Sequence, residues 1–288
     1  MKKLFLLIPA LFTLLLMSCG SSSDTDPGGD GPVIKDSGKQ DGTNDSIGYR
    51  STKSFFQSLP SPLAMAAVFS SSGLKFIDGL GHDPDRADNY SSVKSKAINL
   101  GIYGADLAYC VVNDQPGHSR KYLKAVKLLS DGLEMGSIFN SDDYLERFET
   151  NINRKDSLAM IISELKQEMD LFLNENEKEN MALFVFSGSW IESIYISTQS
   201  IKNKKNESIS RTIAEQKYIL DNLVDLLTDY EKEPNFKDLF LALTDLKSSF
   251  DKTTTKVGDD VAITNFNEQA LKEITDKVAT IRNQFITP

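Results

Sequence analysis

The sequence predicts an all-α protein, a bundle or a stack of antiparallel helical hairpins with about eight or nine helices. From residue 49 onward, apolar residues recur at spacings of three and four, the period of an α-helix. Pro, Gly and Ser/Asp residues stand at the borders of these segments, where helices start and stop. No run alternates like a strand, and residues 183–186, the one ambiguous piece, have helical flanks. Helices joined by short loops pack as antiparallel neighbours.

Four helices are expected in the first half of this region. They cover residues 62–77, 87–112, 119–135 and 141–152. Pro62 suits the first turn of a helix, where its missing N–H would have no intrahelical partner. Gly136 is expected to cap the third helix, because Gly readily adopts the left-handed conformation that ends helices.

Five helices are expected in the second half. They cover residues 157–174, 181–201, 208–230, 236–250 and 263–285. The first of them has the cleanest helical period, with a single apolar stripe. The second is apolar on several faces, which is typical of a central helix.

The first eighteen residues have the pattern of a secretory signal. Lys2 and Lys3 precede an almost unbroken apolar run from Leu4 to Met17. Fourteen helical residues rise ~21 Å, which is too short to cross the ~30 Å hydrocarbon core of a bilayer. A short apolar run behind a basic tip is typical of a signal peptide rather than a membrane span.

The end of this signal, Leu16-Met17-Ser18-Cys19, resembles the lipobox of bacterial lipoproteins cleaved by signal peptidase II. Met17 is a less usual residue at its position in that motif. The resemblance implies that Cys19 is acylated, becomes the new N-terminus and anchors the protein in a membrane through several acyl chains. The alternative is a plain signal peptide with an incidental cysteine.

Residues 19–48 are expected to form a flexible acidic tether, because they are rich in Gly, Ser, Asp and Pro and carry no apolar periodicity. About 29 such residues reach ~30 Å as a random coil. An acidic, Ser-rich patch just after the lipid-carrying cysteine is similar to the export signal of surface lipoproteins in Bacteroidota-type bacteria. We therefore expect an outer-membrane location, on the periplasmic face or the cell surface.

Composition and charge narrow the function. The chain has 288 residues, 40% of them apolar, and a formal net charge of -9. Loss of Lys2 and Lys3 with the signal makes the mature protein more acidic still, and no basic patch is present to bind nucleic acid. With Cys19 committed to lipid, Cys110 has no disulfide partner, and its apolar surroundings favour a buried, unreactive thiol.

Two similar stretches, residues 99–109 and 187–197, carry the candidate site residues. Each places a carboxylate three residues before a tyrosine on the same helix face, Asp106 with Tyr109 and Glu192 with Tyr195. Each also contains small residues, which allow a neighbouring helix to approach closely. The pattern suggests a faint internal duplication, with the two helices facing each other across a core.

The candidate pocket has six members. They are Tyr103, Asp106, Tyr109, Trp190, Glu192 and Tyr195. Paired carboxylates walled by aromatic rings could bind a cation or a sugar, or act as an acid–base pair if burial separates their pKa values. The alternative is that each acid is a buried helix residue bonded to a tyrosine hydroxyl.

No metal site or cofactor is expected. The His82-Asp83-Pro84-Asp85 loop offers one His beside carboxylates, but a Pro-containing turn of this kind more often caps a helix. His118 is the only other histidine, and the sequence has no Gly-rich phosphate loop, nucleophile elbow or paired-Cys motif.

The sequence therefore divides into a signal (1–18), a lipid-anchored tether (19–48) and a helical domain (49–288). The stretches around Asp106 and Glu192 are also similar to helical lipoproteins of Bacteroidota-type bacteria, a resemblance that implies no particular activity. The favoured function is a lipid-anchored cell-envelope binding or interaction protein, with an unknown protein, small molecule or glycan as partner. The alternatives are a cell-envelope hydrolase using Asp106 and Glu192 and a structural component of the envelope.

Overall fold

The computed structural model describes residues 59–141, 143–257, 260–263 and 268–288. The chain divides between Asn44 and Asp45 into two units, and all described residues belong to the second. The expected signal, Cys19 and the tether therefore lie outside the described residues.

The described part is almost entirely helical, which confirms the all-α class, and each of the nine expected segments contains a helix. The α-helices are α2 (Pro62–Ser71), α3 (Val93–Val112), α4 (Pro116–Asp131), α5 (Ser137–Ser141), α6 (Tyr144–Thr150), α7 (Lys155–Glu175), α8 (Glu179–Ile201), α9 (Glu207–Glu215), α10 (Lys217–Thr228), α11 (Pro234–Phe250) and α12 (Glu268–Phe285). Two short 3₁₀ helices, η1 (Pro84–Asn89) and η2 (Asp251–Thr253), lie between them.

Several helix boundaries differ from expectation: the first expected helix already ends at Ser71, the second begins only at Val93, and α5 was not expected. The expected helix 208–230 is divided at Gln216 into α9 and α10. The expected cap at Gly136 is wrong, because α4 already ends at Asp131 with Gly132 as its C-cap. Glu134 then takes the left-handed conformation, with φ of 66°, that had been expected of a glycine.

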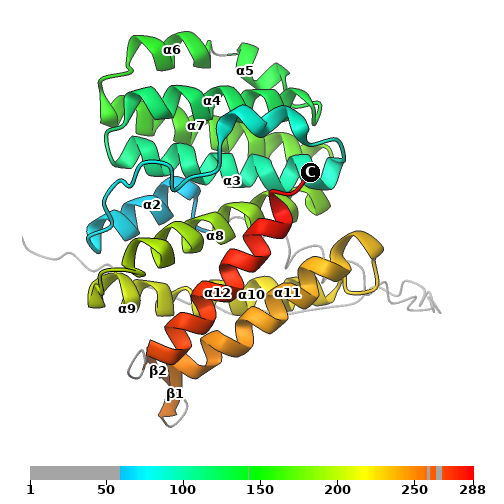
Figure 1. Ribbon diagram of the computed structural model, residues 1–288. Helices are drawn as coiled ribbons and strands as arrows, with labels where there is room; N and C mark the ends of the chain where they lie inside the picture. Colours follow the sequence, from blue (N-terminus) through cyan, green and yellow to red (C-terminus); the bar gives the residue numbers. More distant parts are fainter. Residues whose placement is uncertain (1–58, 142, 258–259, 264–267) are drawn as a thin grey trace, which may run out of the picture. The chain divides into compact units, whose positions relative to one another are not determined.

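A small hairpin joins α11 to α12 through β1 (Thr254–Val257) and β2 (Asp260–Ile263), so the expectation of no strand at all is wrong at this point (Figure 1). The two strands are antiparallel, with Thr254 opposite Ile263. Each strand has only four residues, too few to show an alternating pattern, and Ile263 had been assigned to the following helix. Thr254 and Thr255 begin β1, and β-branched residues favour extended backbone over helix.

Helices α3 and α8 form the centre of the fold, as expected for α8 from its lack of a polar face. Fourteen of the 20 residues of α3 and 15 of the 23 residues of α8 are buried. The α4 and α7 helices pack against α3, while α9 and α12 pack against α8 and α11 lies along α12 (Figure 1). Both central helices are therefore covered on several sides.

Two glycines let the backbones of α3 and α8 touch. A Cβ atom on Gly101 would lie 1.9 Å from the Val185 carbonyl oxygen, and one on Gly188 would lie 2.0 Å from the Ile98 carbonyl oxygen. Neither position therefore accepts any side chain. By contrast, a Cβ atom on Gly104 would meet no atom within 4 Å, so the close approach depends on one glycine from each of the two similar stretches.

Candidate functional site

Asp106 lies on α3, fully buried, under the loop that precedes η1. Its Oδ2 atom accepts a hydrogen bond from the backbone N–H of His82 at 3.0 Å, whereas Oδ1 has no protein donor. A Cβ atom on Gly81 would lie 2.6 Å from Oδ1 of Asp106 and 2.4 Å from the hydroxyl of Tyr122. The loop can close over the carboxyl group only because residue 81 is a glycine.

Glu192 lies on α8 and is held by Arg282 of α12. The guanidinium group donates from Nε to Oε2 at 2.7 Å and from Nη2 to Oε1 at 2.9 Å. The side chains of Glu192 and Arg282 are 0% and 8% exposed. The guanidinium also lies 4.2 Å from the centre of the Tyr195 ring, which adds a cation–π contact. This bidentate geometry is the strong form of a charge-assisted pair.

The two acids lie close enough for their charges to interact. Burial, and next the charge of Glu192, raise the pKa of Asp106 well above its ordinary value of 3.8, and Arg282 only partly opposes this shift. Burial and the neighbouring negative charge both favour the neutral form of Asp106, so Asp106 is the acid of the two that holds a proton. Arg282 donates to both oxygens of Glu192, whereas no cation of the described residues forms a hydrogen bond with Asp106. The buried group then carries one negative and one positive charge and is neutral overall.

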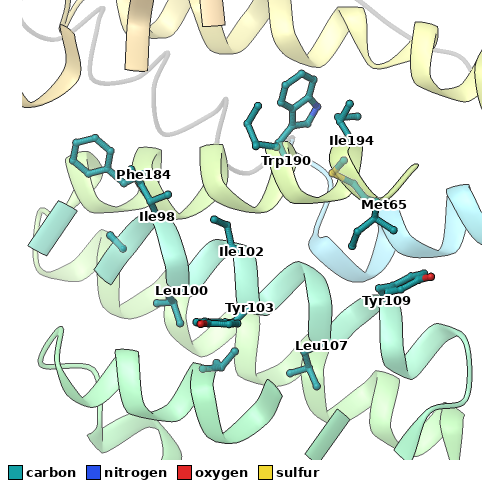
Figure 2. Close-up of a cluster of buried hydrophobic side chains, with 14 of the residues drawn as sticks. Met65, Ile98, Leu100, Ile102, Tyr103, Leu107, Tyr109, Phe184, Trp190 and Ile194 are labelled. Carbon is teal, nitrogen blue, oxygen red and sulfur yellow. The ribbon is translucent and has the colours of Figure 1, made fainter. Parts of the chain in front are cut away.

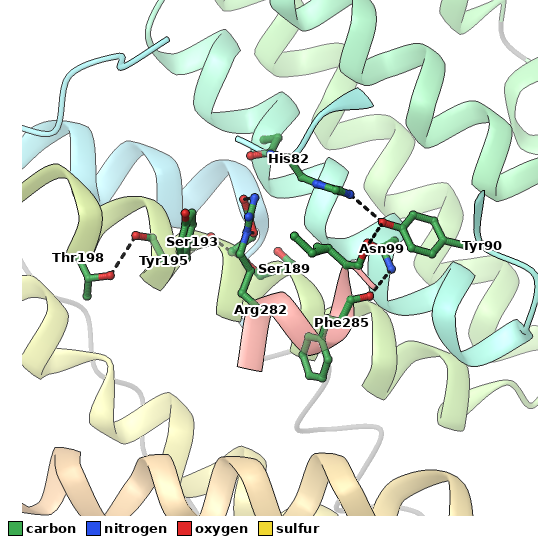
Figure 3. A network of polar contacts seen from close by, with 12 residues as sticks. His82, Tyr90, Asn99, Ser189, Ser193, Tyr195, Thr198, Arg282 and Phe285 are labelled. Atoms are coloured by element: carbon green, nitrogen blue, oxygen red, sulfur yellow. Dashed lines mark hydrogen bonds and ion pairs between the residues drawn. The ribbon is translucent and has the colours of Figure 1, made fainter. Parts of the chain in front are cut away.

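His82 occupies the other side of the same loop. Its Nε2 atom lies 2.7 Å from the hydroxyl of Tyr90, and that hydroxyl donates in turn to the carbonyl of Ile286 at 3.1 Å (Figure 3). Because the Tyr90 proton is used on Ile286, Nε2 of His82 carries the hydrogen. Burial, together with the nearby charges of Arg282 and Arg86, lowers the pKa of His82 from 6.5 to about 4. His82 is therefore neutral at physiological pH.

Side chains of the core also hold the end of α12. Asn99 of α3 donates from Nδ2 to the carbonyl of Phe285 at 2.9 Å, next to the bond from Tyr90 to Ile286 (Figure 3). The last carbonyls of a helix have no intrahelical donors and need partners of this kind. Together with Arg282, these contacts fix α12 onto α3 and α8.

The structure brings together some of the six candidate residues and separates the others. Asp106 and Glu192 lie close enough for their charges to interact, and Tyr195 lies against Arg282, the partner of Glu192. Tyr103 lies close by and stacks on His82, with ring centres 5.1 Å apart, while its hydroxyl donates to the carbonyl of Asp83 at 2.9 Å.

Tyr109 and Trp190 serve other contacts. The hydroxyl of Tyr109 donates to the carbonyl of Lys75 at 2.8 Å and accepts from the N–H of Ile77 at 2.7 Å, which fastens the segment after α2. Trp190 is fully buried beside Phe250 of α11, with ring centres 6.1 Å apart. Figure 2 shows its ring pointing away from Tyr103 and Tyr109.

Four residues of this network are not among the candidates that the sequence predicts. They are Tyr90, Tyr122, Arg282 and, as a member of this group, His82. The sequence does contain a signal for Arg282, because this residue shares the apolar face of its helix with Val278 and Ile281. A lone cation on such a face needs a buried partner of opposite charge. The loop that contains His82 is predicted from the sequence to cap a helix, and Asp83 does cap η1, accepting from the N–H of Asp85 at 3.0 Å.

The geometry at the two acids does not provide a reaction site. Both side chains are 0% exposed, and both oxygens of Glu192 are engaged by Arg282. Among the described residues, no group of three or more His, Cys, Asp or Glu side chains could hold a metal ion. Instead, the hydrogen bonds of the two acids connect α3 to the loop before η1 and α8 to α12.

A separate apolar hollow lies between α7 and α8, and we call it the α7–α8 groove. Its volume is about 240 Å³. Among its lining residues are Leu59, Met169, Leu171, Ala182, Val185 and Phe186. Polar residues, including Lys166, Asp170 and Glu179, also line it. None of the six candidate residues does.

Comparison with known proteins brings no relative. No family model matches the chain, and no curated protein sequence and no solved structure matches it either. Within the described ranges, none of the helices is long and apolar enough to cross a membrane.

Proposed function

We propose that the chain is a lipid-anchored protein of the cell envelope that acts by binding or interaction rather than by catalysis. The observation that carries the second half of this proposal is the burial of Asp106 and Glu192, both 0% exposed. A general acid must come within hydrogen-bond reach of its substrate, and these carboxyl groups reach only protein atoms. The hydrolase alternative would require α12 to leave Glu192 before any substrate could approach.

The anchor is supported by sequence alone. The Leu16-Met17-Ser18-Cys19 motif follows a short apolar run and precedes a long polar tether. Stable anchoring takes two lipid signals, and the acyl chains expected on Cys19 provide them. We propose the outer membrane as the location, with the helical unit carried at the end of the tether.

Fatty-acid labelling tests the anchor. Cells grown with a clickable fatty acid should label the wild type and a Cys110→Ala variant equally, because Cys110 is buried in the core. A Cys19→Ala variant should lose both the label and its place in the membrane fraction. Equal labelling of Cys19→Ala and wild type would refute the anchor.

Complementation tests whether the acids act chemically. In cells that lack the native copy, Asp106→Asn should restore any envelope defect as fully as the wild type, because an amide keeps the shape of the neutral carboxyl group. Cys19→Ala should fail to restore it. Failure of a stably folded Asp106→Asn variant would instead support the hydrolase alternative, since an amide cannot transfer a proton. Protease treatment of intact cells would then place the helical unit on the surface or on the periplasmic face.

A further inference from the structure

The α7–α8 groove lies where the chain enters the described part. Leu59 and Pro60, the first two described residues, line it, and so does Pro62 at the start of α2. The segment that ends at Ser58 is therefore joined directly to the wall of the groove. Whatever that segment carries is held close to this apolar surface by the covalent chain.

The segment carries two adjacent aromatic residues. Between Gly20 and Ser58, the only aromatic residues are Tyr49, Phe55 and Phe56. Phe56 precedes Leu59 by three positions, so a fully extended chain places it at most ~11 Å from Leu59. Phe55 and Phe56 thus remain within reach of the groove in any conformation of the chain.

The groove has the size and chemistry for an aromatic side chain. Its volume of about 240 Å³ exceeds the roughly 150 Å³ of an apolar cavity known to hold one benzene molecule. Met169, Leu171, Ala182 and Phe186 provide carbon and sulfur surfaces, and methionine packs favourably against aromatic rings.

We propose that Phe55 and Phe56 of the same chain occupy the α7–α8 groove and fasten the end of the tether to the helical unit. A ligand tethered by so short a connection has an effective concentration in the millimolar range or above, which favours it over any free partner. Lys53 stands two residues before the pair in the sequence, and its positive charge is complementary to the Asp170 and Glu179 carboxylates that line the groove. This inference goes beyond the proposed function and stands whether or not Cys19 carries lipid.

Chymotrypsin tests this docking in the full mature chain with Cys19→Ala. The enzyme cuts after Tyr, Phe and Trp, and Tyr49 supplies a reference site in the same segment. Cleavage after Phe55 and Phe56 should be at least about tenfold slower than after Tyr49, because a docked ring cannot enter the protease. Equal cleavage at all three sites in the folded wild type would overturn the proposal.

A matched pair of variants locates the protection. Leu171, 43% exposed, lines the groove on α7, whereas Leu241, 54% exposed, lies on α11 outside it. Leu171→Ser should speed cleavage after Phe55 and Phe56 severalfold without changing cleavage after Tyr49, and Leu241→Ser should change neither. Protection that survives both Leu171→Ser and a second groove variant, Ala182→Glu, would overturn the groove as the docking site.

The concentration dependence separates the two sources of the docked segment. Docking within one chain gives protection that is independent of protein concentration. Protection that disappears on dilution, together with a dimer in sedimentation, would assign the segment to a second copy and overturn the intramolecular form. Unchanged circular dichroism spectra of the variants exclude unfolding as the cause of faster cleavage.

Discussion

Replacement of Asp106 by Asn should change how the stability of the protein depends on pH. In the folded protein the pKa of Asp106 is raised above 3.8, so between 3.8 and the raised value the folded state binds one proton more than the unfolded state. Stability contributed by this group is therefore complete below 3.8 and declines as pH rises, by about 1.4 kcal/mol per pH unit, until the raised pKa is reached. An asparagine keeps the size and shape of the neutral carboxyl group but does not titrate.

His82 contributes a slope of the opposite sign, which must be separated from that of Asp106. Its pKa is lowered from 6.5 to about 4, so between these values the unfolded state binds the extra proton and stability rises with pH. The total rise is roughly 3 kcal/mol. Over the range where both groups titrate, the two slopes nearly cancel in the wild type. Asp106→Asn should uncover the rise due to His82.

Urea unfolding at a series of pH values, followed by the fluorescence of Trp190, measures these free energies. Trp190 is the only tryptophan of the chain and is fully buried, so its emission reports on the core. Above pH 4, the free energy of unfolding of Asp106→Asn should increase relative to that of the wild type by about 1.4 kcal/mol per pH unit. A constant difference from pH 4 to pH 7 would refute the protonated state of Asp106. The infrared band of a protonated carboxyl group, lost in Asp106→Asn, provides an independent check.

Two further substitutions probe the core. Arg282→Met leaves Glu192 buried without its cation and should lower the free energy of unfolding by about 3–5 kcal/mol. The double variant Arg282→Met with Glu192→Gln should lose clearly less than the sum of the two single changes. Strict additivity in urea unfolding would show that the pair is not coupled. Gly188→Ala should cost about 3 kcal/mol or more, because its Cβ atom would lie 2.0 Å from the Ile98 carbonyl oxygen. Gly104→Ala on the facing helix meets no atom within 4 Å and should instead gain about 1 kcal/mol; equal thermal shifts for the two alanines would contradict the crossing geometry.

The sequence predicts the helices well because their apolar periods are long and their borders carry Pro, Gly and Ser. It also predicts that the helices of Asp106 and Glu192 face each other, since small residues recur in both. It does not predict which residues of each helix point inward. Trp190 lies two residues after Gly188, about 200° around the helix, and so points away from α3, whereas Glu192 lies about 40° from Gly188 and points toward it.

Partners from distant parts of the chain are harder to predict. Arg282 meets Glu192 across 90 residues of sequence, and no local pattern encodes that pairing. The β1–β2 hairpin was missed because four-residue strands between helices have too little pattern of their own. The loop before η1 can cover Asp106 only because residue 81 is a glycine. This requirement cannot be predicted from the sequence, because it arises from the position of Asp106 in the folded structure.

The Glu192–Arg282 pair also governs the order in which the chain can complete its fold. During synthesis, Glu192 emerges 90 residues before the arginine that neutralises it. Until α12 arrives, α3 and α8 cannot bury both acids against each other without stranding an anion, so the centre of the fold stays unfinished. A chain cut short before α12 therefore lacks more than one helix, because its central helix pair loses the counter-ion on which its burial depends. Nascent chains of this protein are incomplete in charge as well as in length.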